Sequence, residues 1–174
     1  MKRDALLDAA EAVLLEHGTQ ALTLSAVAER AAVSKGGLLY HFPTKEALVT
    51  ALVSRVIAEF DAQVEHYEDG AEGSFTRAFV EATFATIAAP GGERTGRRWA
   101  AITAAATTPE LAAPLRAAME RWHHRGAAED ADPVTAMVVR LAAEGLWEVA
   151  AHDPGQFSPE QYTALRRRLL DLLG

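Results

Sequence analysis

The sequence predicts an all-α fold of about nine helices, divided into two domains. The chain has 174 residues, enough to bury a sizeable core, and it is 49% hydrophobic but only 7% aromatic. This alanine-rich composition favours helix. Apolar residues recur three or four positions apart, which is the spacing of helices with one buried face. No segment shows the alternation that is typical of a strand.

Capping residues and helix breakers place the four N-terminal helices. Thr23, Ser34 and Thr44 each precede a helical pattern and are good N-caps, because their hydroxyls can accept a hydrogen bond from a free backbone N–H. Gly18 ends the first helix. Pro43 ends the third, because the residue before a proline disfavours helical backbone. The sequence therefore predicts helices over residues 2–17, 24–31, 35–41 and 45–67.

Glycine-rich and acidic segments separate five further helices. The breaks read EDGAEGS, APGGERTG, GAAEDAD and HDPGQFS. The second of these, residues 89–96, is expected to be the most flexible loop of the chain. The patterns between the breaks predict helices over about 75–88, 97–106, 109–125, 133–151 and 159–173.

The charge pattern restricts nucleic-acid binding to a local patch. The formal net charge is −7, and all three lysines, Lys2, Lys35 and Lys45, lie within the first 45 residues. The first 50 residues carry a net charge of −1, whereas the remaining part of the chain carries −6. Because phosphate contacts need basic groups, any DNA contact must be a small patch on an otherwise acidic protein.

The second and third helices form a helix-turn-helix pattern. Only residues 32–34 separate them, and Ala28 lets the two helix axes approach closely. The apolar wedge between the helices is expected to consist of Leu24, Val27, Val33 and Leu38. The third helix then presents its N-terminus outward, as reading of the DNA major groove requires. We therefore expect a DNA-binding domain over residues 1–46 and a second helical domain over residues 47–174.

Two glycines open the third helix at a cost to its stability. In a helix interior each of Gly36 and Gly37 is about 1 kcal/mol less favourable than alanine. Without side chains, the backbone there can lie close to base edges or to the sugar-phosphate wall. Lys35 and Lys45 lie in first turns, where the helix dipole disfavours a cation by about 0.3–1 kcal/mol. A bound phosphate reverses that effect, so the set together indicates a DNA contact.

The segment LTLSAVAERAAVSKGGLLYHFPTKEAL, residues 22–48, closely resembles the N-terminal DNA-binding domain of the tetracycline-repressor (TetR) family. The resemblance covers about residues 4–53, and beyond them the match is architectural only. It implies a bacterial, cytoplasmic, homodimeric transcription regulator, usually a repressor that a small-molecule effector releases from a palindromic double-stranded DNA operator. The candidate DNA contacts are Thr23, Ser25, Ser34, Lys35, Gly36, Gly37, Tyr40, His41 and Lys45.

Three residues depart from the family pattern. Ala32 stands where the family often has glycine, and alanine costs about 1–2 kcal/mol there if the backbone φ is positive. Gly37 replaces a commoner threonine, serine or alanine, and Leu39 replaces a frequent tyrosine. Few side chains are then left to read bases, and Lys35 and Ser25 are the best candidates.

In the family, the C-terminal helices surround an effector cavity. The candidate effector contacts, with Arg98 as a further polar group, are Phe79, Phe84, Trp99, Met119, Trp122, His123 and Trp147. The last two helices each carry an apolar stripe, and pairing both across a two-fold axis gives a four-helix bundle. The stripes consist of Val134, Val138, Leu141, Gly145 and Val149, followed by Tyr162, Leu165, Leu169 and Leu172. Ordinary core packing is the alternative for both sets.

Two other functions remain as alternatives. A helix-turn-helix regulator without a small effector is the first. A helical metal-dependent enzyme is the second: Glu120 and His123 have the spacing of a di-metal ligand pair, but a second Glu-x-x-His is missing. Glu148 and His152 are one residue further apart. The chain has no cysteine, nucleophile elbow or phosphate loop. We therefore expect neither an enzyme nor a cofactor or metal site, and neither a signal peptide nor a membrane span.

Overall fold

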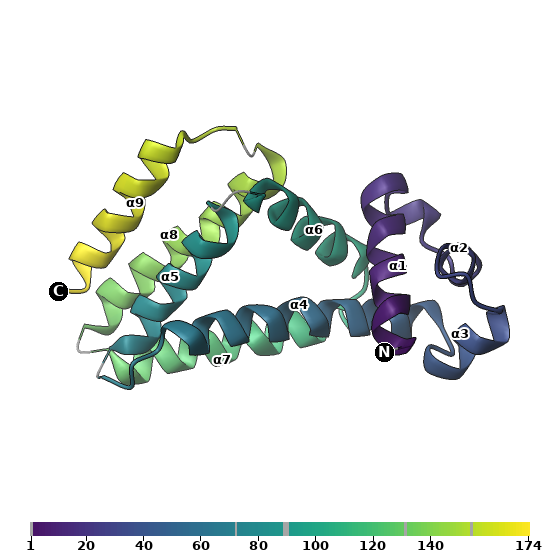
Figure 1. The fold of residues 1–174 in the computed structure, drawn as a ribbon. Coiled ribbons are helices and arrows are strands. Elements are labelled where there is room, and N and C mark those ends of the chain that lie inside the picture. The colour runs from purple at the N-terminus through teal and green to yellow at the C-terminus, as the bar shows by residue number, and fades with distance from the viewer. Residues whose placement is uncertain (1, 72, 89–90, 131, 154) are drawn as a thin grey trace. The chain divides into compact units, whose positions relative to one another are not determined.

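The computed structural model describes residues 2–71, 73–88, 91–130, 132–153 and 155–174. Within this part of the chain the fold is all-α, as predicted, with nine α-helices and one short 3-10 helix (Figure 1). The helices are α1 (Lys2–His17), η1 (Thr19–Ala21), α2 (Leu24–Arg30), α3 (Lys35–His41), α4 (Lys45–Tyr67), α5 (Ser74–Ile87), α6 (Gly92–Ala105), α7 (Ala113–Glu129), α8 (Pro133–His152) and α9 (Pro159–Leu172). None of the helices in the described residues is long and apolar enough to cross a membrane.

The N-terminal helices begin and end where the local signals predict. The hydroxyls of Thr23, Ser34 and Thr44 each accept a hydrogen bond of 3.1 Å from the backbone N–H three residues further on. Each cap satisfies a backbone donor that has no partner inside its helix. α3 ends at His41 and α4 begins at Lys45, as predicted.

The predicted flexible loop at residues 89–96 is helical over most of its described part. α6 begins at Gly92, earlier than predicted, while residues 89 and 90 lie outside the described residues. Gly96 has a packing role instead, because a Cβ built there would lie only 2.8 Å from the Cβ of Ala150 on α8. A glycine that reads as a loop signal in the sequence here permits two helices to approach closely.

The seventh helix begins and ends later than predicted. The sequence predicts that Gly126 stops it, but α7 continues beyond that residue. A Cβ at Gly126 would lie 2.6 Å from Nη1 of Arg140 on α8, so the glycine makes room for that guanidinium group. Arg140 is buried and donates a hydrogen bond to the backbone oxygen of Trp122. Burial lowers the pKa of Arg140, while the nearby charges of Glu144 and Asp130 act in the opposite direction.

The described residues form two compact units, each assembled from two stretches of chain. Unit 1 comprises Met1–Val56 and Arg98–Arg116, and unit 2 comprises Ile57–Arg97 and Ala117–Gly174. Helices α4, α6 and α7 each supply residues to both units. The division differs from the predicted boundary after residue 46, because packing groups the first half of α4 with α1–α3. The α4 residues buried in unit 1 include Leu48, Val49, Leu52 and Val53.

Within unit 1, α2 packs against both α1 and α3. Val27 and Leu38 are buried, in agreement with the predicted wedge between α2 and α3, and Leu24 is half-buried. Val33 is 41% exposed, so its predicted place in the wedge is wrong. It belongs to the turn between the helices, where its backbone N–H donates to Ala28 O at 3.0 Å and its side chain remains in contact with solvent.

Ala32, in the same turn, has a φ of 53° and is the only described residue other than glycine with a positive φ. Its backbone N–H donates to Glu29 O at 3.0 Å. Left-handed backbone brings the Cβ of an L-residue close to the following carbonyl oxygen, which costs about 1–2 kcal/mol, whereas glycine adopts it freely. The cost expected for alanine at this position therefore applies.

We predict that Ala32→Gly raises the free energy of unfolding by about 1 kcal/mol, the relief of backbone strain less the extra entropy that glycine loses on folding. Ala31→Gly is the matched control, because Ala31 has a φ of −82° and gains no relief. That control should lower the free energy of unfolding by about 0.5–1 kcal/mol. Urea unfolding followed by circular dichroism measures both. Equal effects at the two positions would contradict strain at Ala32.

A buried carboxylate joins three helices of unit 1. Glu11 on α1 is 8% exposed and accepts hydrogen bonds from Arg55 on α4 and Arg98 on α6. Arg98 Nε lies 2.6 Å from Glu11 Oε2, and Arg55 Nε lies 3.0 Å from Glu11 Oε1. Arg55 also donates to Asp8 at 2.7 Å. A carboxylate is stable in such a place only when its charge is paired, and Arg98 serves this pairing.

We predict that Glu11→Gln lowers the free energy of unfolding by about 3 kcal/mol, because it leaves two mostly buried guanidinium groups without their shared counter-charge. Glu16→Gln is the matched control. Glu16 pairs with Arg30 at 2.6 Å on the surface, where solvent screens the charges, so only a small change is expected. Chemical unfolding at neutral pH compares the two variants, and equally small losses would show that the buried pairing does not stabilise unit 1.

Unit 2 is built around α5, which packs against α8 and α9 (Figure 1). Its core contains an aromatic cluster of Phe60, Phe79, Trp122 and Trp147. The ring of Phe60 meets the other three edge to face, at centroid distances of 5.1, 5.3 and 5.5 Å respectively. The indole N–H of Trp122 donates to Asp61 Oδ1 at 2.7 Å, which satisfies its polar atom inside the core.

Candidate nucleic-acid interface

The outer face of α3 is open to solvent, whereas its inner face is fixed. Leu38 is fully buried and anchors the helix, while Lys35, Gly36 and Gly37 are exposed. Tyr40 is 86% exposed, the highest value among the exposed large hydrophobic side chains of the described residues. The inner face of α3 is therefore packed against unit 1, while its first turn is exposed to solvent.

No internal contact explains the two glycines that open α3. A Cβ built at Gly36 would meet no atom within 4 Å, and one at Gly37 would meet Ser34 Oγ at 3.3 Å. Both glycines have ordinary helical φ rather than positive φ. They lower helix stability without relieving a close contact among the described residues. The open space beside them is thus available to another molecule.

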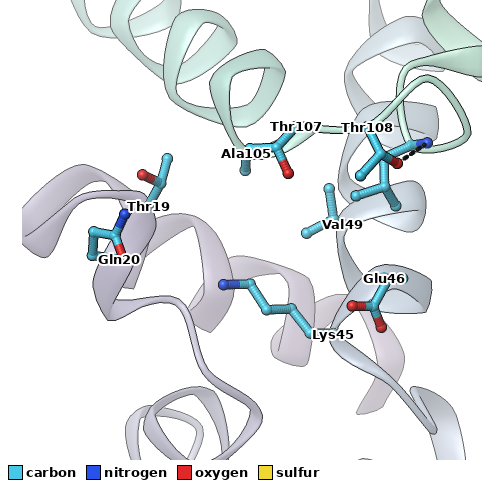
Figure 2. A pocket seen from close by; sticks show the side chains of 9 residues that line it. Thr19, Gln20, Lys45, Glu46, Val49, Ala105, Thr107 and Thr108 are labelled. Atoms are coloured by element: carbon cyan, nitrogen blue, oxygen red, sulfur yellow. Dashed lines mark hydrogen bonds between the residues drawn. The ribbon is translucent and has the colours of Figure 1, made fainter.

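Lys45 begins α4 and lines a cavity of about 330 Å³ in unit 1. Its side chain extends from the start of α4 toward Thr19 and Gln20 (Figure 2). The described residues provide no hydrogen bond or ion pair to its ammonium group. The charge is therefore free to pair with an anion.

The remaining predicted DNA contacts also lie in unit 1. Thr23 and Ser34 use an oxygen lone pair as a helix cap, which leaves each hydroxyl hydrogen free to donate to another acceptor. Ser25 is exposed in the first turn of α2. His41 is half-buried, with its ring edge against Tyr40 at a centroid distance of 5.2 Å. All nine predicted residues thus belong to one compact unit.

The predicted effector contacts are distributed over both units. Three of them, on α5, α7 and α8, belong to the aromatic cluster of unit 2, whereas Trp99 belongs to unit 1. His123 lines one cavity of unit 2 and Phe84 lines another. Met119 is half-buried on α7. Phe79, Phe84 and Trp122 are buried, and ordinary core packing accounts for these three.

Two cavities in unit 2 lie between pairs of helices. One cavity, of about 400 Å³, lies between α7 and α8, and His123, Met137 and Leu141 form part of its wall. The other, of about 460 Å³, separates α5 from α9, with Phe84 and Tyr162 in its wall. Both fall in the size range of small-molecule sites and have apolar or aromatic walls.

The apolar stripe of α8 is exposed in the single chain. Val134, Val138 and Leu141 are 70%, 55% and 54% exposed. Gly145 is also exposed, and Val149 is half-buried. A run of exposed aliphatic side chains on one helix is unusual for a monomer surface and is typical of an interface.

The apolar stripe of α9 is mostly turned toward its own unit. Tyr162 and Leu169 are buried, and the Tyr162 ring lies edge-on to Phe84 of α5 at a centroid distance of 6.3 Å. Leu165 is half-buried, and Leu172 is 39% exposed. Packing between α9 and α5 thus accounts for Tyr162 and Leu169.

The sequence singles out Glu120 with His123 and Glu148 with His152, whereas in the structure the ion-pair partner of His123 is Glu144. His123 Nε2 lies 3.3 Å from Glu144 Oε1, and His152 Nδ1 lies 3.5 Å from Glu148 Oε2. Among the described residues, no three histidine, aspartate or glutamate side chains gather as a metal site would require.

A capped, outward-facing reading helix in a helix-turn-helix, combined with a larger all-helical part, defines a class of DNA-binding transcription regulators. The sequence family narrows this class. The model of the bacterial regulatory proteins of the tetR family matches residues 6–52, and the model of the tetracyclin repressor-like C-terminal domain matches residues 73–174. The chain belongs to the tetR family of transcriptional regulators, which confirms the resemblance seen in residues 22–48.

Individual relatives agree with this assignment. The HTH-type transcriptional regulator UidR of Escherichia coli K12 is 26% identical over 172 residues, which cover 97% of this chain and 75% of UidR. RutR of the same strain is 41% identical over 56 residues, or 32% of this chain and 26% of RutR. A transcriptional regulator from Rhodococcus sp. Rha1 has the same fold, with a TM-score of 0.79, 21% identity and coverage of 99% and 96% of the two chains.

A structure of the multidrug binding protein EbrR complexed with malachite green is also similar. It has a TM-score of 0.72 and 25% identity, and the match covers 99% of this chain and 98% of EbrR.

The open space at Gly36 predicts that a larger side chain there changes both stability and duplex binding. Gly36→Leu should raise the free energy of unfolding by up to about 1 kcal/mol, because leucine is a better helix former and its Cβ would meet no atom within 4 Å. It should weaken duplex binding by about tenfold or more, because the new side chain keeps the backbone away from DNA. Thermal unfolding and a duplex titration on the same sample measure both effects.

Gly36→Ala is the matched variant for this test. It adds only a Cβ, so the same gain in stability should come with a smaller loss of affinity. Unchanged affinity in both variants would mean that the glycine pair does not face DNA.

Proposed function

We propose that this protein is a cytoplasmic, homodimeric repressor that binds a palindromic DNA operator through α3 and leaves it when a small molecule binds unit 2. The observation that carries the proposal is the start of α3. Gly36, Gly37 and Lys35 form an exposed surface there. The two glycines lower helix stability, and no contact among the described residues offsets this loss. A DNA backbone against this helix N-terminus would supply both the missing contact and the counter-charge.

The proposed effector response is supported by a relative and by the cavities of unit 2. EbrR, at 25% identity, has been solved with malachite green. The α7–α8 and α5–α9 cavities of about 400 and 460 Å³ are large enough for small organic molecules. Helices α4, α6 and α7 supply residues to both units, so a change in unit 2 has three continuous connections to the unit that carries α3.

The proposed dimer uses the exposed stripe of α8. Val134, Met137, Val138 and Leu141 are each at least half exposed, and burial against a second copy would remove this apolar surface from water. Helix-turn-helix proteins of this type usually read two half-sites, about 34–36 Å apart on DNA, with one reading helix from each subunit.

A regulator without a small effector is the second candidate. The aromatic cluster around Phe60 favours it, because three of the predicted effector contacts pack edge to face on this ring. The two candidates differ in one observable. Only the first predicts that a small molecule lowers operator affinity, whereas both predict sequence-specific binding to DNA.

The direct test is selection of bound duplexes from a random pool by the purified full-length chain. We expect a palindromic product whose half-sites are one helical turn apart, which would establish the operator and the two-fold symmetry together. A pool that shows no enrichment at low salt would overturn the proposed function. A library of cationic and neutral aromatic compounds, screened against the selected duplex, then separates the two candidates.

The dimer proposal predicts the behaviour of Val138→Asp. A carboxylate at the centre of the α8 stripe would lose its hydration on dimerisation, so the variant should sediment as a monomer at micromolar concentration. Leu15→Asp is the matched control, because Leu15 is an exposed leucine of α1, 40% accessible, outside the stripe. Analytical ultracentrifugation of both variants decides the point, and a Val138→Asp dimer as stable as that of the control would exclude the α8 interface.

A further inference from the structure

The cavity beside Lys45 combines three segments that are far apart in the sequence. η1 supplies Thr19 and Gln20, the start of α4 supplies Lys45 and Val49, and the loop after α6 supplies Thr107 (Figure 2). All of them belong to unit 1, so the cavity lies in the same compact unit as α3. It has a volume of about 330 Å³, at the lower end of small-molecule sites.

The charge of this cavity comes from Lys45 and Glu46, which point in different directions (Figure 2). The Lys45 ammonium group extends across the cavity toward η1, and no described residue makes a hydrogen bond or an ion pair within 4 Å with it. The carboxylate of Glu46 interacts with groups at the start of α4. A hydrogen bond with its own backbone N–H is the main cause that lowers its pKa below the ordinary value, and a hydrogen bond with the Thr44 side chain is the second. The charge of Lys45 also contributes to lowering this pKa. The cavity therefore has one ammonium group and one carboxylate in its lining, and the ammonium group is the one that extends across the open space.

Part of the cavity wall is apolar, and Thr19, Gln20, Thr107 and Thr108 supply neutral donors and acceptors. Val49, Ala105 and Leu111 are buried and form the apolar wall. The Val49 side chain and the Thr107 hydroxyl are directed into the open space (Figure 2). One cation, a short apolar wall and hydroxyl or amide groups together match a compact organic molecule that carries a single carboxylate.

We propose that this cavity binds small organic monocarboxylates, with the Lys45 ammonium group as the partner of the carboxylate and Val49, Ala105 and Leu111 against the apolar body. The site is separate from the effector cavities proposed in unit 2. Binding also has a consequence that rests on the proposed function: Lys45 is a candidate phosphate contact, so a bound carboxylate and a DNA phosphate compete for one ammonium group. Carboxylate binding therefore lowers operator affinity.

The site is tested first without DNA, on the full-length isotope-labelled chain, with benzoate and its neutral isostere benzamide as probes. Two-dimensional NMR titration should shift the methyl signals of Val49, Ala105 and Leu111 with benzoate. Benzoate should bind about tenfold more tightly than benzamide, a difference of about 1.4 kcal/mol. Absence of these shifts at millimolar benzoate would overturn the site.

Three variants assign the roles within the cavity. Lys45→Met keeps the aliphatic stem and should remove the preference for benzoate over benzamide. Lys35→Met is the matched control, because it removes a lysine that lies outside the cavity, and it should leave both affinities unchanged. Ala105→Met fills part of the space and should weaken both probes. Full benzoate preference in Lys45→Met would overturn the role of Lys45, and spectra of each variant without probe report whether it is folded.

The link to DNA is tested separately with the selected duplex at constant ionic strength. Replacing chloride by benzoate should raise the duplex dissociation constant of the wild type but not that of Lys45→Met, and benzamide should have no effect. Benzoate binding with unchanged duplex affinity would overturn the competition for Lys45. That result would leave the proposed DNA-binding function intact, because that function fails only if no duplex is selected.

Discussion

Unit 1 depends on one charge interaction, the pairing of Glu11 with Arg55 and Arg98. Three helices meet at this carboxylate, and each contributes one charged group: α1 the acid, α4 and α6 the two guanidinium groups. Because an unpaired charge is costly in a mostly buried place, the three helices have few alternative registers that keep all the groups satisfied. The interaction therefore fixes the end of α6 in the same unit as the reading helix.

This constraint creates the setting of Lys45. With α6 held by Arg98, the residues that follow it, including Ala105 and Thr107, form one wall of the cavity that Lys45 crosses. A lysine at the first position of a long helix is otherwise an unfavourable choice, since the helix dipole repels its charge. The position becomes reasonable if an anion is bound there, whether a DNA phosphate or a small carboxylate.

Several local conflicts of this chain lie in the helix-turn-helix of unit 1. Ala32 in left-handed backbone, and the glycines that open α3, each lower stability without an internal compensation. In unit 2, Gly96 and Gly126 have structural reasons instead, because they allow α6 and α7 to lie close to α8. Gly145 lies inside α8, and a Cβ built there would meet no atom within 4 Å. We propose that a second copy of the chain covers this exposed face of α8.

The sequence by itself determined the helix-turn-helix, because its signals are local. The caps at Thr23, Ser34 and Thr44 and the stop at Pro43 act within one turn of backbone, so they fix the bounds of α3 and the start of α4 without knowledge of the rest of the fold. The exposed face of α3 followed from the same short segment. The family membership also followed from residues 22–48, which carry the motif.

Only the tertiary structure decided the features that join distant segments. Gly96 and Gly126 lie in segments that read as breaks, yet both lie inside helices, where a Cβ would come within 3 Å of atoms of α8. The pairing of Glu11 with Arg98 and the walls of the Lys45 cavity likewise leave no periodic signal in the sequence. The partner that covers Tyr162 on α9 was likewise not determined by the sequence. An apolar stripe predicts that a helix face is covered, but whether α5 or a second chain covers it depends on packing in three dimensions.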